Sequence, residues 1–144
     1  MEKITINADI HVLAVAAPFF PEGVPTAFDK LHSLLDDSTP RRIFGLSRPE
    51  KDGDIVYRAA AEEMSEGEAQ QLESESLTIK KGTYISMTVD NYKQDIPAIG
   101  RAFEELLEVP NLDPEGYCVE LYDPKSAGYG TANESVICMI RLDD

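Results

Sequence analysis

The chain of 144 residues has few basic residues, few cysteines and histidines, and no long apolar run. Its 13 lysines and arginines are outnumbered by 27 aspartates and glutamates, which gives a formal net charge of −14. Because affinity for nucleic acid depends mainly on cationic contacts to phosphates, this balance argues against direct binding of DNA or RNA. The same negative field favours cationic ligands.

The two cysteines, Cys118 and Cys138, lie in strand-like segments with no histidine nearby in the sequence. This pattern predicts reduced, buried thiols and gives no reason to expect a metal ion or another cofactor. No apolar run approaches the roughly 18 to 20 residues of a spanning helix, and the N-terminus lacks the layout of a signal peptide. We therefore expect a cytoplasmic protein that does not associate with membranes.

The periodicity of apolar residues predicts the same order of elements twice, and so an α+β fold. The expected elements are a strand over 3–17, a helix over 25–36, strands over 41–47 and 54–62, a strand pair or one bent strand over 77–80 and 83–89, a helix over 95–108, and strands over 117–123 and 134–142. The acidic segment 64–75 is expected to be a solvated connector.

The length and this order predict a single domain over 1–144, built from two structural repeats at about 1–63 and 76–144. Phe28 precedes Ile43 by fifteen positions, and Phe103 precedes Cys118 by the same fifteen. Each β-α-β-β unit is expected to form an antiparallel sheet with its helix on one face, which leaves a central cleft between the halves. The oligomeric state stays open.

The segment 117–122 is the most informative part of the sequence. In a strand, Cys118, Glu120 and Tyr122 share one face, while the intervening residues face the other way. A carboxylate in a half-buried strand costs free energy unless it is paired or solvated. Glu120 is therefore a candidate for a ligand site, and the alternative is an edge-strand carboxylate paired with an arginine or a lysine.

Six segments carry a resemblance to a known family: RRIFGLS at 41–47, DIVYRAAAE at 54–62, KKGTYISMTVDNY at 80–92, IGRAFEELLE at 99–108, CVELYDP at 118–124 and VICMIRL at 136–142. In order and spacing they resemble the GyrI-like small-molecule-binding domains, which also form the effector-binding half of AraC-type and MerR-type transcription activators. The resemblance implies a duplicated α+β fold with a central cleft. The chain departs from the family pattern in having no tryptophan and in carrying Ala60 or Ala61 where a glycine is usual.

The resemblance also implies site residues. A glutamate in a Glu-x-Tyr context lies at the floor of the family's cleft and faces cationic or amphipathic ligands, and Glu120 with Tyr122 matches that context. Tyr57 and Tyr84 are similar to the aromatic residues that line the cleft. These four residues are the predicted ligand-binding set.

Three functions remain open at this point. The favoured one is a stand-alone, non-catalytic domain that captures a cationic or amphipathic small molecule, as an effector sensor of the transcription-regulator type with a possible protein partner. The second is a hydrolase of reactive electrophiles that uses Glu120 with a tyrosine, named here as Tyr84, with Tyr57 and Tyr122 as the alternative hydrogen-bond donors. The third is an acidic protein-interaction or inhibitor module, which needs no chemistry in the cleft.

Overall fold

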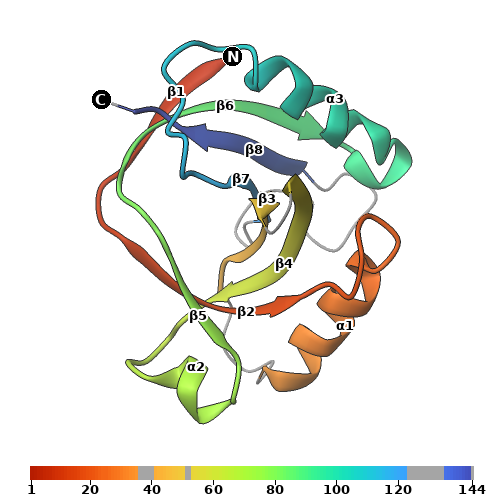
Figure 1. Cartoon of the computed structure of the whole chain (residues 1–144), viewed down its shortest axis with the longest axis vertical. Helices are drawn as coiled ribbons and strands as arrows, with labels where there is room; N and C mark the ends of the chain where they lie inside the picture. The colour runs from red at the N-terminus through yellow and green to blue at the C-terminus, as the bar shows by residue number, and fades with distance from the viewer. Residues whose placement is uncertain (36–40, 51–52, 123–134, 144) are drawn as a thin grey trace.

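The computed structural model describes residues 1–35, 41–50, 53–122 and 135–143. Within these residues, eight strands form one antiparallel sheet in the order β1-β6-β8-β7-β3-β4-β2-β5, curled into a half-barrel (Figure 1). The strands are β1 (Glu2–Ile6), β2 (Ile10–Ala16), β3 (Ile43–Glu50), β4 (Asp54–Glu62), β5 (Glu75–Ile79), β6 (Gly82–Asp90), β7 (Cys118–Tyr122) and β8 (Ser135–Arg141). The predicted α+β class is confirmed.

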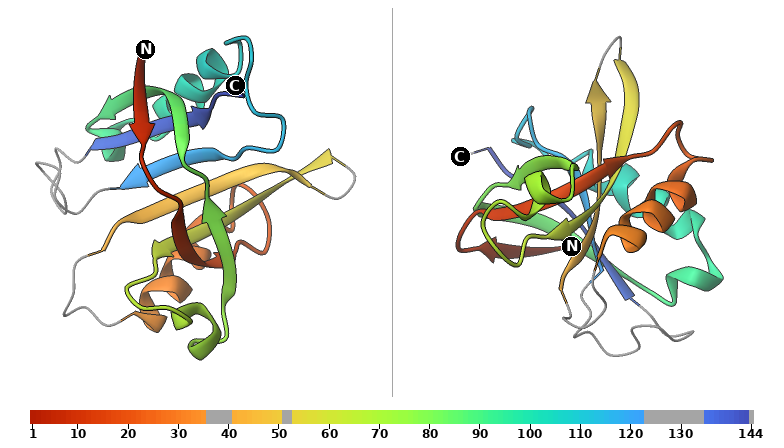
Figure 2. Two further views of the ribbon diagram at one scale, coloured as in Figure 1. Left: turned by 90° about the vertical axis from the view of Figure 1, so that its left-hand side faces the viewer. Right: turned by 90° about the horizontal axis from the view of Figure 1, so that it is seen from below.

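Helices α1 (Val24–Leu34) and α3 (Pro97–Leu106) lie on the same face of the sheet (Figure 2). Helix α1 packs on β2 and β4, and α3 packs on β6 and β8. Counted outward from the central β3–β7 pair, β8 and β6 hold the same places on one side as β4 and β2 hold on the other. Two short helices complete the described structure, α2 (Glu68–Gln71) and the 3-10 helix η2 (Tyr92–Gln94). None of the described helices is both long enough and apolar enough to cross a membrane.

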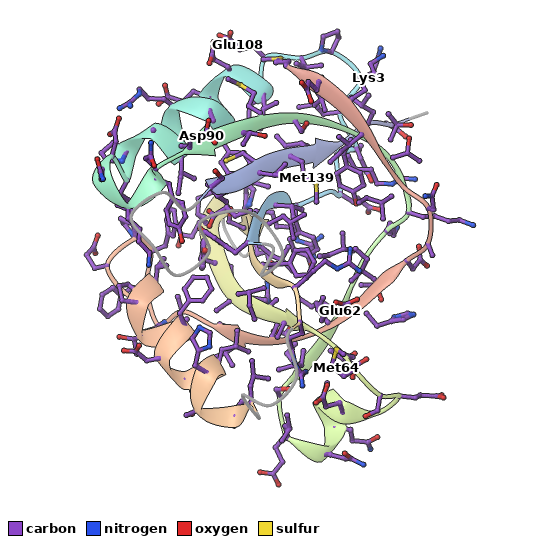
Figure 3. All side chains as sticks on the ribbon, turned by 180° about the vertical axis from the view of Figure 1, so that it is seen from behind. Lys3, Glu62, Met64, Asp90, Glu108 and Met139 are labelled. Atoms are coloured by element: carbon purple, nitrogen blue, oxygen red, sulfur yellow. The ribbon has the colours of Figure 1, made fainter. Side chains whose placement is uncertain are left out.

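An apolar core fills the inner side of the curl. It joins Phe44, Leu46 and Met139 from central strands to Ile4 of β1 and Ile79 of β5, the strands at the two ends of the sheet. Figure 3 shows Met139 among the side chains inside the curl. Two further apolar clusters lie under α1 and α3 on the other face.

The strand order is symmetric about the β3–β7 pair. Reading outward, β3 corresponds to β7, β4 to β8, β2 to β6 and β5 to β1. In the central pair, Gly45 is the direct partner of Glu120. The predicted duplication of β-α-β-β units is therefore found, but the two units share one continuous sheet where two sheets were expected.

This continuity moves the predicted cleft. An apolar core packs on the inner side of the curl, and the hollow of about 560 Å³ that the described residues leave beside it is polar. The space between the two units lies instead on the helix-bearing face, between α1 and α3.

Two predicted strand boundaries are corrected. The segment 3–17 forms two strands, because β1 pairs with β6 at one end of the sheet while β2 lies between β4 and β5 near the other end. Strand β3 continues through Pro49 to Glu50, beyond the expected end of the strand at residue 47. Proline is tolerated there because the ladder with β7 stops at Ser47, so the outer part of β3 pairs with β4 alone.

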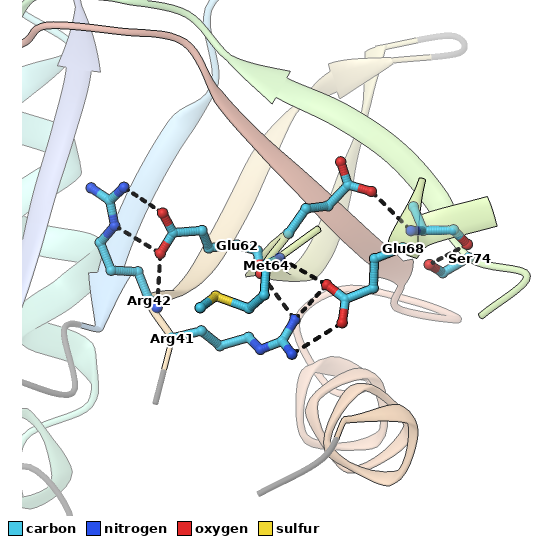
Figure 4. A network of polar contacts seen from close by, with 8 residues as sticks. Arg41, Arg42, Glu62, Met64, Glu68 and Ser74 are labelled. Atoms are coloured by element: carbon cyan, nitrogen blue, oxygen red, sulfur yellow. Dashed lines mark hydrogen bonds and ion pairs between the residues drawn. The ribbon is translucent and has the colours of Figure 1, made fainter. Parts of the chain in front are cut away.

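The acidic segment 64–75 is exposed over most of its length, as the sequence predicts, but it also contains α2 and is held to the rest of the fold by ion pairs. Glu68 of α2 accepts two hydrogen bonds from the buried Arg41, at 2.8 and 3.1 Å, and one from the backbone N–H of Met64 at 2.9 Å (Figure 4). Next to this pair, Arg42 donates to Glu62 at 2.7 Å. These ion pairs attach α2 and its flanking turns to the start of β3.

Candidate functional site

A cavity of about 640 Å³ lies between α1 and α3, with strands β3, β4 and β7 beneath it. Its lining is mostly apolar and aromatic, and among the described lining residues Glu120 is the sole aspartate or glutamate. The lining comprises Phe20, Pro21, Val24, Pro25, Ser47, Ile55, Tyr57, Tyr92, Ile96, Ile99, Gly100, Phe103, Leu107, Cys118, Glu120 and Tyr122.

Glu120 comes from β7, which lies between β3 and β8 in the middle of the sheet, and its side chain is 9% exposed. Tyr57 on β4 donates a hydrogen bond to Glu120 Oε1 at 2.7 Å, and Tyr122 donates to the same oxygen at 2.6 Å. Among the residues that the structure describes, no lysine, arginine or histidine forms an ion pair with Glu120. The alternative of a paired edge-strand carboxylate is therefore not what the fold shows.

Gly45 makes room for this arrangement. It lies in β3, between Ala59 of β4 and Glu120 of β7. A Cβ atom at position 45 would overlap the hydroxyl of Tyr57 and would lie 2.5 Å from Glu120 Oε1. The missing side chain is what allows a phenol from β4 to reach across β3 to the carboxyl group on β7.

Aromatic rings surround the carboxyl group. Phe20 stacks on Tyr57 with ring centroids 5.8 Å apart and an interplanar angle of 15°. Phe28 of α1 meets both site tyrosines edge-on, at 6.1 Å from Tyr57 and 6.0 Å from Tyr122. Tyr92 of η2 contacts Tyr122 at 5.4 Å. Such packing holds the two hydroxyl donors in place over Glu120.

The electrostatics of the site make ionisation of the carboxyl group harder than in water. Burial raises the pKa of Glu120, and the hydrogen bonds from Tyr122 and Tyr57 offset this only in part. Burial, together with the charge on Glu120, also raises the pKa of Tyr57 and Tyr122 far above the usual value, so both phenols keep their protons.

The structure brings together three of the four predicted ligand-binding residues: Glu120, Tyr122 and Tyr57. It does not bring Tyr84 to them. Tyr84 of β6 faces the inner core, and its hydroxyl donates to the carbonyl oxygen of Lys80 at 2.6 Å. Burial raises its pKa to about 12. It borders a separate polar hollow of about 560 Å³ on the opposite side of the sheet.

The predicted sharing of one strand face by Cys118, Glu120 and Tyr122 is confirmed, since all three line the cavity. Burial raises the pKa of Cys118 to about 11, so its thiol stays protonated and is a weak nucleophile. Both cysteines are free. Within the described residues, no group of three histidines, cysteines, aspartates or glutamates could hold a metal ion.

Sequence reasoning missed Phe20, Phe28, Tyr92 and Gly45. The sequence shows Phe28 and Phe103 at equivalent places in the two repeats, fifteen positions before Ile43 and Cys118, but this spacing does not reveal that both lie on the helices beside the cavity. Tyr92 lies within a segment that carries the family resemblance. Nothing local in the sequence distinguishes Gly45, because its role depends on two neighbouring strands.

Comparison with known proteins shows similarity at the level of structure alone: no family model matches the chain, and no curated protein matches it in sequence. The solved structure of SAV2435 bound to tetraphenylphosphonium aligns with a TM-score of 0.64 at 11% identity, over 99% of this chain and 93% of that one. A Staphylococcus aureus protein named for bacterial transcription regulation aligns with a TM-score of 0.59 at 11% identity, over 99% and 97%. A hydrolase from Listeria innocua aligns with a TM-score of 0.52 at 11% identity, over 99% and 91%.

These alignments cover nearly the whole length of both partners, so the likeness concerns the fold as a whole and not one segment of it. The chain therefore has a GyrI-like fold, as the resemblance in sequence predicts. At such identities the likeness defines the fold, and the function has to be argued from the cavity itself.

Proposed function

We propose that the chain is a small-molecule-binding domain that takes an amphipathic organic cation into the cavity between α1 and α3. The observation that carries this proposal is Glu120, a buried carboxyl group inside an aromatic cavity, with no cationic partner among the described residues. A structural carboxylate at such a depth is normally paired with a cation. A bound cation would supply the missing charge.

The surroundings of Glu120 suit a lipophilic cation better than an inorganic ion. The faces and edges of Phe20, Tyr57 and Tyr92 offer cation–π attraction of about 0.5 to 2 kcal/mol per contact. The apolar helix residues Ile99 and Phe103 offer area for hydrophobic burial. The charge and the apolar body of the ligand would thus be recognised by different parts of one cavity.

The cavity also has an apolar rim that faces solvent. Phe20, Ile55, Ile96 and Leu107 line it and are between 42% and 57% exposed. Large exposed apolar side chains gathered at the mouth of a cavity are typical of a ligand-binding site. The tetraphenylphosphonium complex of SAV2435 supports the ligand class, since that compound is a large aromatic cation.

A thermal-shift titration with tetraphenylphosphonium tests the proposal. We expect concentration-dependent stabilisation of the wild-type protein and its loss in Glu120→Gln, which keeps the side-chain shape but removes the charge. Glu66→Gln is the matched control, because it removes the same charge from an exposed site away from the cavity and should leave the shift unchanged. Equal stabilisation of all three proteins would contradict recognition through Glu120.

A sensor role, in which the occupied cavity alters contact with a protein partner, is the extension of this proposal towards regulation. The structural neighbour named for transcription regulation supports it. Pull-down with and without tetraphenylphosphonium would test it, and an identical set of captured proteins in both conditions would argue against it.

A hydrolase is the second candidate, and the hydrogen bonds between phenols and carboxyl group favour it. Glu120 could act as a general acid when protonated and as a general base when ionised. Tyr57 and Tyr122 donate hydrogen bonds to it, as supporting residues do in general acid–base sites. The Listeria innocua neighbour is named as a hydrolase. Tyr84, the tyrosine first considered for catalysis, lies on the other side of the sheet, so Tyr57 or Tyr122 would take that role.

Turnover is detectable by mass spectrometry after incubation with strained electrophiles such as epoxides. A hydrolysed product that forms with the wild-type protein and is lost in Glu120→Gln would establish the hydrolase. Product formation no faster than in buffer would leave binding as the function.

A further inference from the structure

Among the residues that the structure describes, the titratable groups around Glu120 are phenols and thiols, which are neutral at ordinary pH. They come from each element around it: Tyr57 from β4, Tyr122 and Cys118 from β7, Cys138 from β8 and Tyr92 from η2. The helices above the cavity contribute apolar side chains, Val24 and Pro25 from α1 and Ile99 and Phe103 from α3. A carboxylate in this setting would be a buried charge without compensation, which is costly.

The hydrogen bonds also divide the two oxygens of Glu120. Both phenols donate to Oε1, and no described residue donates to Oε2. A carboxylate is best satisfied when donors approach both of its oxygens, whereas a carboxylic acid needs acceptor capacity at one oxygen and carries its proton on the other. With both donors on Oε1 and none from a described residue on Oε2, the phenols offset only part of the cost of a buried charge at Glu120, so burial still favours the acid form in an empty site.

We propose that the cavity exchanges the proton of Glu120 for a monovalent organic cation. The exchange rests on the proposed function of cation binding. The O–H bond of the Glu120 carboxyl group breaks, the proton passes to solvent, and the resulting carboxylate pairs with the cation without forming a covalent bond. The total charge inside the cavity is zero before and after the exchange.

Two properties follow from this charge balance. One proton is released for each cation bound while Glu120 is protonated in the empty site, so affinity rises about tenfold per pH unit and levels off once Glu120 has ionised. A ligand with two positive charges leaves one of them uncompensated, because Glu120 is the sole acid among the described lining residues. Proton exchange would thus also select for ligands with one charge.

Isothermal titration calorimetry with tetraphenylphosphonium tests the exchange, at about pH 5, 6, 7 and 8, with two buffers of different ionisation enthalpy at each pH. The difference in heat between the two buffers gives the number of protons released. We expect release of close to one proton where Kd falls with rising pH, and release of close to none on the plateau. Triphenylphosphine oxide, a neutral aromatic compound, should show neither effect.

Each outcome decides the question. Binding of tetraphenylphosphonium with a Kd that is flat over the whole range and with no proton release would overturn the exchange and leave the proposed function standing. No binding at any pH would overturn both. Benzyl viologen, an aromatic dication, tests the valence, because binding as tight as that of tetraphenylphosphonium would overturn the restriction to one charge.

The Glu120→Gln variant identifies the titrating group. We expect weak binding of tetraphenylphosphonium without pH dependence, and a pH slope that survives in this variant would overturn the role of Glu120. Infrared difference spectroscopy provides a readout on the wild-type protein alone: a carboxylic acid carbonyl band that Glu120→Gln lacks should disappear when the cation is added. A folded wild-type protein without that band at about pH 5 would also overturn the proposal.

Discussion

At the scale of single residues, the site depends on the missing side chain of Gly45 as much as on the carboxyl group of Glu120. We expect Gly45→Ala to push Tyr57 away from Glu120, because the new Cβ would overlap the phenol oxygen. The predicted cost is about 1 to 3 kcal/mol of stability together with weaker cation binding, measured by urea unfolding and calorimetry. Gly100→Ala is the control for stability alone, because its Cβ meets open space in α3 and should stabilise the helix by up to about 1 kcal/mol, although Gly100 also lines the cavity.

Loss of one phenol hydroxyl should weaken the charged form of Glu120. Tyr57→Phe keeps the ring that stacks on Phe20 but removes a hydrogen bond that lowers the pKa of Glu120. Because a hydrogen bond to a charged group contributes about 1.5 to 3 kcal/mol, we expect tetraphenylphosphonium to bind at least tenfold more weakly. Tyr84→Phe is the matched control and should bind as the wild type does. Weaker binding in Tyr84→Phe together with unchanged binding in Tyr57→Phe would place the site on the other side of the sheet.

At the scale of elements, the Arg41–Glu68 ion pair ties α2 to the start of β3. Glu68→Gln would leave the guanidinium of Arg41 buried with a neutral partner. We expect a loss of about 1 to 3 kcal/mol in urea unfolding, with tetraphenylphosphonium binding unchanged because α2 does not contribute to the cavity. A changed affinity for tetraphenylphosphonium in this variant would contradict the expectation, because it would mean that the Arg41–Glu68 ion pair influences the cavity.

The elements also show how far the sequence predicts this molecule. Periodicity located both long helices and the alternation of β7, because these patterns follow from local geometry. It failed for the first strand segment and for Tyr84, because strand order and the curl of the sheet are set by partners distant in sequence. The ion pairs of the acidic segment were missed for the same reason, since Arg41 is 27 positions from Glu68.

At the scale of the whole molecule, two groups of glutamates should give opposite pH dependences of stability. Hydrogen bonds from Arg58, Arg42 and Arg41 lower the pKa of Glu50, Glu62 and Glu68, respectively. The folded state therefore holds these protons less tightly than the unfolded state. Their stabilisation is present above the usual pKa of 4.5 and is lost as the pH falls through the lowered values.

Glu120 has the reverse sign. Burial raises its pKa above the usual 4.5, so its contribution is fully present below that pH and is lost as the pH rises through the folded-state value. We expect the free energy of unfolding of the wild type to fall, relative to that of Glu120→Gln, as the pH rises above about 4.5. Urea titrations of both proteins at a series of pH values measure the difference. Parallel curves would contradict a raised pKa for Glu120.

The pairing of Gly45 with Glu120 at the centre of the symmetric strand order bears on why the two units share one chain. A homodimer of identical single units would present the same residue twice at its axis, either two glutamates in repulsion or two glycines without charge. Covalent fusion removes that constraint, because one unit can supply the acid while the other supplies the empty volume beside it. A glutamate opposite a glycine at the centre of the sheet can therefore form in a chain with two fused units. It cannot form in a symmetric dimer of identical units.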